Sequence, residues 1–326
     1  MSSSILRRIR LPALGLAFAF VAVACSSGGG ETPAADAGAQ GQQQQDEVVA
    51  AVASYDVHVG EDRFIVGLFT GSNEFVVGGD ATFQFSYIGN EQPEPGPVSP
   101  ATFLALPGED PDHLHDHAHA GAASEGRGIY AARVEFDRAG PWEVEVELKV
   151  EEETIAARAA FQVAEEPAVP DVGDEAPKTK NLTLDDIGEA PAEAVDSRAQ
   201  NGEEVPDPGL HETTIAEAIR RGHPAVVAFD TPVFCQSRFC GPVNNMIEEL
   251  SEEYGDRAEF IHVEIWRDFQ NQVINKSAAD WILRDDNLNE PWVFFIDGDG
   301  VIRARWDNVA TRGEIEPFLE DLTKLS

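Results

Sequence analysis

The sequence predicts two folded parts, an all-β domain over residues 50–164 and an α/β domain over residues 210–326. In the first part, apolar residues alternate with charged ones from Trp142 to Val150, which is the period of a strand with one buried face. In the second part, apolar residues recur at helical spacing between short continuous apolar runs. A chain of 326 residues, 42% of them hydrophobic, can bury a core in both domains.

The first 25 residues have the pattern of an export signal. Three arginines precede an apolar run from Leu11 to Ala24, which is too short to favour a membrane-spanning helix. The run ends in Ala22-Val23-Ala24-Cys25, which resembles a bacterial lipobox. The resemblance implies that residues 1–25 are a lipoprotein signal peptide and that lipidated Cys25 anchors the chain to the outer face of the cytoplasmic membrane. The alternative is ordinary signal cleavage nearby, with Cys25 incidental.

Composition limits the partners and marks two connecting segments. The chain has 59 acidic and 23 basic residues and a formal charge of −36, so we expect no nucleic-acid partner, because phosphate binding needs clusters of Lys and Arg. Residues 26–49 are dominated by Gly, Ser, Ala and Gln, which predicts a flexible tether. Residues 165–209 are rich in Pro, Glu, Asp and Ala and are expected to link the two domains.

Further strand-like runs fill the first domain, over residues 64–69, 81–88, 129–136 and 154–163. A turn signal, Asp137-Arg138-Ala139-Gly140-Pro141, separates two of the strands. The stretch GIYAARVEFDRAGPWEVEVEL resembles the immunoglobulin-like domains of the YtkA/FixH type found in bacterial envelope proteins. This resemblance implies an immunoglobulin-like β-sandwich.

A histidine-rich segment lies between these strands, in a stretch from Asn90 to Gly128 that we expect to be a loop. Its sequence EDPDHLHDHAHAG places histidines at alternate positions, namely His113, His115, His117 and His119. Imidazoles are common ligands of Zn and Cu, so this loop could bind either metal. The alternative is a solvated loop of low complexity, and we expect no cofactor to be required.

The second domain is predicted to run in the order β-α-β-α-β-β-α. Thr213-Thr214 can cap a helix that Gly222 stops, and Thr311 and Glu314 have the spacing of a capping box. Asp297 to Gly300 predicts a hairpin turn. The strands are expected over residues 225–229, 260–265, 292–296 and 301–306, and the remaining helices over residues 243–250 and 270–283. His262 falls within a strand and is expected to be a core or edge residue.

Two segments of this domain resemble the thioredoxin-like superfamily. VVAFDTPVFCQSRFCGPVNNMIEELSEEY resembles its strand, active-site turn and following helix, and Glu290-Pro291-Trp292 stands where the family has a cis-proline before a strand. The resemblance implies thiol–disulfide exchange at Cys235 and Cys240, with Pro291 leaving nearby backbone groups free to pair with an extended substrate. The sequence departs from the family twice. The spacing is Cys-X4-Cys, and Ala228 stands where the family has a buried acid.

The five-residue spacing restricts where the cysteines can lie. On one regular helix they would point ~140° apart, whereas a disulfide needs Cα atoms ~4.4–6.8 Å apart. We therefore expect Cys235 in the turn before the helix and favour it as the nucleophile. The alternative nucleophile is Cys240, because the Gly241-Pro242 that follows would place it at a helix N-terminus, where a thiolate is stabilised.

These patterns favour a membrane-anchored, extracytoplasmic thiol–disulfide oxidoreductase that acts on protein thiols or disulfides of the cell envelope. One alternative is a protein that handles copper in the envelope. A second is a non-catalytic thioredoxin-like binding module in which the cysteine pair is a permanent disulfide. The direction of the redox reaction is left open by the sequence.

Overall fold

The computed structural model describes residues 48–108, 127–150, 153–235, 237, 239–285 and 287–321. Cys25 and the four histidines from His113 to His119 lie outside these residues. None of the described helices is long and apolar enough to span a membrane.

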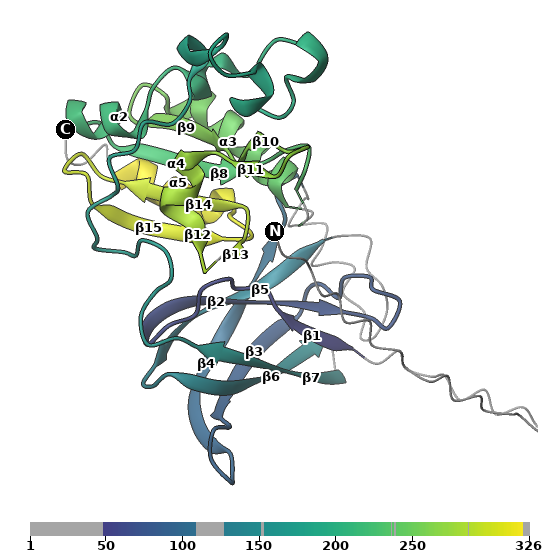
Figure 1. Cartoon of the computed structure of the whole chain (residues 1–326). Helices are drawn as coiled ribbons and strands as arrows, with labels where there is room; N and C mark the ends of the chain where they lie inside the picture. The colour runs from purple at the N-terminus through teal and green to yellow at the C-terminus, as the bar shows by residue number, and fades with distance from the viewer. Residues whose placement is uncertain are drawn as a thin grey trace, which may run out of the picture. The chain divides into compact units, whose positions relative to one another are not determined.

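Seven antiparallel strands form the first part of the structure (Figure 1). They are β1 (Val49–Val52), β2 (Gly60–Phe69), β3 (Asp80–Tyr87), β4 (Glu94–Ala105), β5 (Gly128–Phe136), β6 (Gly140–Val150) and β7 (Glu153–Val163). The strand order in the sheet is β1-β2-β5-β4-β3-β6-β7. The alternation from Trp142 to Val150 is confirmed, since the apolar side chains of β6 are buried.

This sheet is nearly closed on itself. The amide of Val59 donates to the carbonyl of Ala164 at 3.0 Å, and the amide of Ala164 donates to Val57 at 2.8 Å, so the start of β2 meets the end of β7. Aromatic side chains fill the interior, with Phe64 and Phe85 in edge-to-face contact. The all-β prediction is confirmed, and the closed arrangement is consistent with a sandwich.

Strand β4 corrects one expectation, because part of the stretch from Asn90 to Gly128 is not loop. Its residues pair with β3 on one side and β5 on the other. Three prolines hid the strand, since a proline cannot donate a ladder hydrogen bond. The register shifts opposite Gln84 and Ser86, and the bulge lets Pro97 remain inside the strand.

The second part is a mixed α/β region around a four-stranded sheet. Its main elements are α2 (Ile215–Arg221), β8 (Ala225–Asp230), α3 (Cys240–Tyr254), β9 (Glu259–Glu264), α4 (Lys276–Ile282), β14 (Trp292–Ile296), β15 (Ile302–Asp307) and α5 (Arg312–Asp321). The strand order is β15-β14-β8-β9, and only the β8–β9 pair is parallel. The predicted order β-α-β-α-β-β-α is present within this region, with helix α2 before it.

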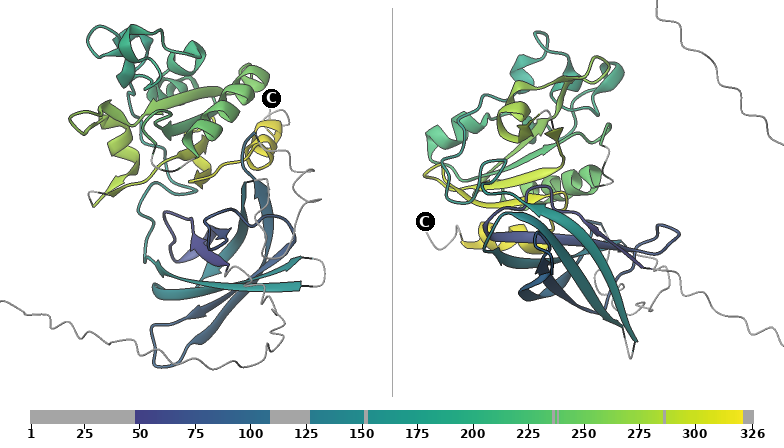
Figure 2. Two further views of the ribbon diagram at one scale, coloured as in Figure 1. Left: turned by 90° about the vertical axis from the view of Figure 1, so that its right-hand side faces the viewer. Right: turned by 60° about the horizontal axis from the view of Figure 1, so that its bottom comes forward.

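Helices cover both faces of this sheet (Figure 2). Alternate residues of β8 point to opposite sides, so Val227 and Phe229 pack with α2 and α4, while Val226 and Ala228 pack with α3 and α5. The predicted N-cap and C-cap of α2 are both observed, with Thr214 accepting from Glu217 and Gly222 at φ 71°.

The helix expected over residues 270–283 is shorter than predicted. Val273 and Ile274 instead form β11, which pairs with β10 (Trp266–Asp268), and the helix begins at Lys276. The side chain of Asn275 donates to the carbonyls of Ala194 and Glu264, and these tertiary bonds override the helical spacing upstream. A second short pair, β12 (Leu283–Arg284) with β13 (Asn287–Leu288), follows α4.

Residues 165–209 connect the two parts and are packed along much of their length. Val169 and Ala176 belong to the core on one face of the sheet, and the Ala176 amide donates to Gly300 at 2.9 Å. Four 3₁₀ helices lie here and just beyond: η1 (Leu184–Asp186), η2 (Ala192–Ala194), η3 (Gln200–Gly202) and η4 (Pro208–His211). Composition did not predict this packing, because the apolar side chains that the segment buries are few and mostly small.

Candidate functional site

The cysteine pair lies where β8 passes into α3. Cys235 is in the turn, its amide donating to the Thr231 carbonyl at 3.0 Å, and Cys240 is the first residue of α3. The two form a disulfide with Cα atoms 6.1 Å apart. The expectation that Cys235 precedes the helix is therefore confirmed. Cys240 is fully buried and Cys235 is half-buried, so Cys235 is the cysteine that a partner can reach.

Glu290 supplies a carboxylate beside this pair. Its carboxylate and the two sulfurs all lie within 4.8 Å of one another, and the residue is 9% exposed. The peptide bond from Glu290 to Pro291 is cis, as the thioredoxin resemblance implies. Ala228, which stands where the family has an acid, is buried and belongs to the core cluster that contains the apolar side chains of α3. Glu290 therefore places a buried carboxylate beside the cysteine pair, which sequence reasoning overlooked.

Ser237 is the polar neighbour of Cys235 in the turn. Its Oγ lies 3.4 Å and its carbonyl oxygen 3.3 Å from Cys235 Sγ. The hydroxyl can donate to sulfur, and such a bond strengthens when the sulfur becomes a thiolate.

Tyr55 reaches this site from the seven-stranded part. Its hydroxyl lies 2.7 Å from the Glu290 carbonyl oxygen and 2.9 Å from Asn308 Oδ1, and its ring contacts Trp292. Burial raises the pKa of Tyr55, so the phenol remains a donor. No sequence pattern pointed to Tyr55, because its partners stand more than 230 residues away.

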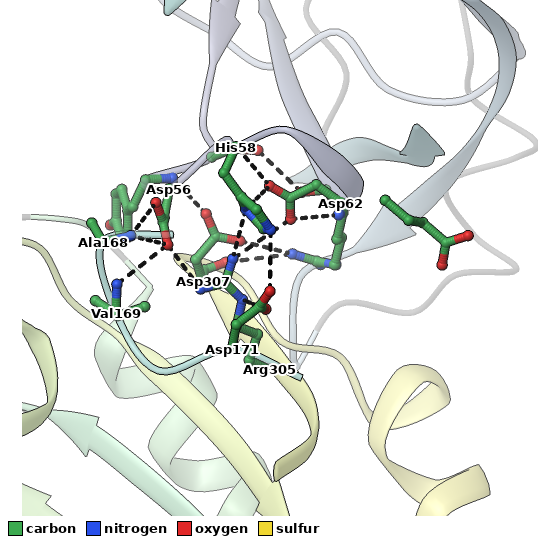
Figure 3. A network of polar contacts seen from close by, with 12 residues as sticks. Asp56, His58, Asp62, Ala168, Val169, Asp171, Arg305 and Asp307 are labelled. Atoms are coloured by element: carbon green, nitrogen blue, oxygen red, sulfur yellow. Dashed lines mark hydrogen bonds and ion pairs between the residues drawn. The ribbon is translucent and has the colours of Figure 1, made fainter. Parts of the chain in front are cut away.

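An ionic network surrounds Asp56 and His58, which directly follow Tyr55 in the chain (Figure 3). Arg305 of β15 pairs with Asp56 at 2.8 Å and with Asp171 at 2.9 Å. His58 lies 3.1 Å from both Asp62 and Asp171, and hydrogen bonds to these two carboxylates raise its pKa to about 9. Because the charges come from both parts and from the connecting segment, the network fixes the neighbours of Tyr55 against β15.

Arg63 of β2 makes a second link between the seven-stranded part and the α/β region. Its guanidinium donates to Glu314 at 2.7 Å and to the carbonyl of Val309 at 2.8 Å. It also lies 3.4 Å from the buried Asp307, whose pKa burial raises to about 6.

A groove with both apolar and polar lining residues adjoins the cysteine turn. It has a volume of about 390 Å³, and its lining includes Phe234, Trp266, Phe269 and Val273. Phe234 immediately precedes Cys235, and its ring stacks on Phe269 with centroids 3.9 Å apart. Phe269 and Val273 are more than a third exposed. The groove can therefore hold apolar side chains next to Cys235.

A separate, fully buried cluster lies behind the turn. Asp196 Oδ2 is 3.4 Å from His211 Nε2 and 3.6 Å from His262 Nδ1, while His262 Nε2 is 3.2 Å from Asp230 Oδ1. All four side chains are 0% exposed. His262 is a core residue, one of the two positions expected for it, but no sequence pattern indicated that it meets Asp196 and His211.

The charges of this cluster perturb one another. Burial lowers the pKa of His262, but Asp230 and Asp196 outweigh it and raise that pKa to about 9. Burial raises the pKa of Glu264 to about 7. Burial also lowers the pKa of His211.

Comparison with models of known protein families finds no match, and comparison with the curated proteins finds none either. The structure therefore defines an α/β region with a disulfide-bonded Cys-X4-Cys pair next to a nearly closed β-sheet. It brings together Cys235, Cys240 and Pro291 from the predicted site residues and adds Glu290 and Tyr55.

Proposed function

We propose that this protein is a thiol–disulfide oxidoreductase of the thioredoxin-like type, with Cys235 and Cys240 as its redox pair. The observation that carries the proposal is the disulfide between a half-buried turn cysteine and the buried first residue of a helix, with a carboxylate within 4.8 Å of both sulfurs. A disulfide that only stabilised the fold would close a very short loop, worth ~2 kcal/mol in the chain-entropy model.

The thioredoxin-like assignment rests on three features. The elements follow the order β-α-β-α-β-β-α, the pair lies at the start of α3, and the proline before β14 follows a cis peptide bond. Each is what the resemblance of the two sequence segments implies.

In the reducing direction, the thiolate of Cys235 attacks one sulfur of a substrate disulfide. The substrate S–S bond breaks, its other sulfur leaves as a thiolate that takes a proton from water, and a mixed disulfide forms. Cys240 loses its proton and attacks Cys235 Sγ, which re-forms the Cys235–Cys240 bond and releases the second substrate thiolate. The substrate gains two electrons and the pair loses two. The oxidising direction is the reverse, and the geometry favours neither.

Glu290 is suited to receive the proton of Cys240 during the second attack. Its carboxylate is close to both sulfurs and 9% exposed, so water competes weakly for that proton. The helix N-terminus at Cys240 favours the resulting thiolate as well.

The groove beside Phe234 provides a place for the substrate. The aromatic part of its lining suits an apolar side chain next to the reacting cysteine of an unfolded or extended segment. We include in the proposal that the chain acts in the cell envelope, anchored by lipid on Cys25 beyond the tether of residues 26–49.

Trapping of the mixed disulfide tests this function. In a Cys25→Ser background, a Cys240→Ser variant should form a stable adduct with a peptide carrying an activated disulfide, detected by intact mass. A Cys235→Ser variant is the matched control and should react far more slowly, because Cys240 is buried. Adduct formation through Cys240 alone would reverse the assigned roles. Failure of both variants to form an adduct would overturn the proposed function.

Metal handling is a second candidate, favoured by one observation. The sulfurs of Cys235 and Cys240 and the Glu290 carboxylate are close enough to share an ion once the disulfide is reduced. Titration of the reduced chain with Cu(I) or Zn²⁺, compared with Cys235→Ser, separates the candidates. A redox enzyme predicts metal affinity that does not depend on this thiol.

A further inference from the structure

We propose that Asp196, His211 and His262 form a structural zinc site, independent of the cysteine pair. Each residue offers one ligand atom, and the three atoms lie within 4.8 Å of one another. The residues come from three separate segments: the connecting segment, η4 and β9.

The spacing of the ligand atoms fits a tetrahedral ion. Zinc bonds of about 2.0–2.1 Å place neighbouring ligands about 3.3 Å apart in a tetrahedron and about 2.9 Å apart in an octahedron. Asp196 Oδ2 lies 3.4 Å from His211 Nε2 and 3.6 Å from His262 Nδ1. Both distances are closer to the tetrahedral value. The rings of His211 and His262 are nearly perpendicular, at 80°, with centroids 5.2 Å apart.

The polar atoms of the cluster lack the partners that burial demands. Neither ring nitrogen of His211 or His262 makes a hydrogen bond of standard geometry with the described residues, and the same holds for both Asp230 oxygens. Burying a polar group without a hydrogen-bond partner destabilises the folded state. A bound ion at His211 and His262 would satisfy one nitrogen of each ring.

The surroundings already have the form of a second ligand shell. His262 presents Nδ1 to Asp196 and Nε2 to the Asp230 carboxylate at 3.2 Å, as metal-bound histidines do when their other nitrogen donates to a carboxylate. Arg198 donates to Asp196 Oδ2 at 2.7 Å and orients this carboxylate toward the two rings. These contacts set the direction of two of the three ligands.

The charge around the cluster also favours a divalent cation. Three carboxylates, Asp196, Asp230 and Glu264, are at most 1% exposed. Arg198 pairs with Asp196, and the same guanidinium also forms ion pairs with Glu248 and Asp207. The three buried carboxylates would balance the charge of a bound divalent ion once both histidines are neutral.

The ligand set and its burial suit structural zinc. Two imidazoles and one carboxylate are ligands that Zn²⁺ accepts, and all three side chains are 0% exposed, which fits a structural rather than a catalytic ion. A bound ion would join residues 196 and 211 to β9 directly behind the cysteine turn, where Ser197 Oγ accepts from the Val233 amide at 3.2 Å. Zinc would thereby brace the turn that carries Cys235.

Elemental analysis of the full chain tests the site. The parent carries Cys25→Ser, Cys235→Ser, Cys240→Ser and alanine at His113, His115, His117 and His119, so that neither thiols nor the histidine-rich loop bind metal. It is unfolded with chelator and refolded with or without Zn²⁺. We expect about one zinc ion per refolded chain and a zinc-dependent rise in Tm. Co²⁺ should give the intense visible bands of a tetrahedral site.

A His211→Ala variant should lose the bound zinc and the Tm rise. The control is His223→Ala, which removes a histidine whose side chain is 60% exposed, and it should retain both. If His211→Ala does not fold, the zinc content and the zinc-dependent Tm of the refolded parent test the proposal by themselves. A refolded parent that binds no zinc, or a His211→Ala chain that binds as much as the control, would overturn the proposal.

Discussion

The hydroxyl of Tyr55 lies 2.7 Å from the carbonyl oxygen of Glu290, so a residue of the seven-stranded part occupies a backbone group next to the proline of the cysteine site. The thioredoxin resemblance implies that backbone groups here pair with an extended substrate. Under the proposed function, Tyr55 would compete for a position that a peptide substrate uses.

Replacing Tyr55 with Phe removes this hydrogen bond and keeps the ring against Trp292. We expect a loss of about 1–3 kcal/mol in the free energy of unfolding, because the Glu290 carbonyl loses a partner. The rate of exchange with an extended peptide disulfide should rise, while the rate with glutathione disulfide should stay unchanged. Stopped-flow kinetics of both reactions check this. An equal change in both rates would contradict the competition.

Glu290→Gln tests the role of the carboxylate beside the sulfurs. The amide cannot accept the Cys240 proton, so we expect release of substrate from the mixed disulfide to slow by about 100-fold near neutral pH. The rate in the variant should then rise with pH as the thiol ionises by itself. Rapid quenching with acid and mass analysis measures the mixed disulfide. The control is Glu203→Gln, which changes an exposed glutamate. If the control variant had the same pH profile as Glu290→Gln, the proton-accepting role of Glu290 would be excluded.

His58 should make stability depend on pH in the alkaline range. Its carboxylate partners raise its pKa to about 9 from an ordinary value of 6.5, so the folded state holds the proton more tightly. The stabilisation is complete below pH 6.5 and is lost as pH rises through 9. Urea midpoints at pH 6 and pH 9.5 should differ more in the wild type than in His58→Gln. Equal differences would mean that His58 contributes nothing.

Two arginines of β15 allow a matched comparison. Arg305 is 7% exposed and paired with Asp56 and Asp171, whereas Arg303 is 51% exposed and paired with Asp297. Arg305→Ala leaves the buried Asp56 without its cationic partner and should cost about 3–5 kcal/mol. Arg303→Ala should cost about 1 kcal/mol or less, because water screens the exposed pair. Urea unfolding measures both, and similar losses would show that the network does not hold the two parts together.

The elements with strong local signals were the ones that sequence could predict. Trp142 to Val150 alternates, Gly222 ends α2, and the spacing of Cys235 and Cys240 requires one cysteine outside the helix. These features depend on neighbours in the chain.

The features that sequence missed depend on distant partners. Strand β4 is hidden by prolines that a bulge accommodates, and the contacts of Tyr55 with Glu290 and of Asp196 with His262 join residues far apart in the chain. A single sequence contains no signal that assigns such distant residues to one another. The lipid anchor at Cys25 and the metal site in the histidine-rich loop remain predictions, since both lie outside the described residues.

The reduction potential of the Cys235–Cys240 disulfide tests the central claim most directly. The Cys25→Ser chain is equilibrated with glutathione buffers of stepped potential, its free thiols are alkylated, and the oxidised fraction is read by mass. A redox pair predicts a midpoint between about −270 and −120 mV, the range of catalytic disulfides. A midpoint below about −300 mV, where structural disulfides resist reduction, would contradict the account.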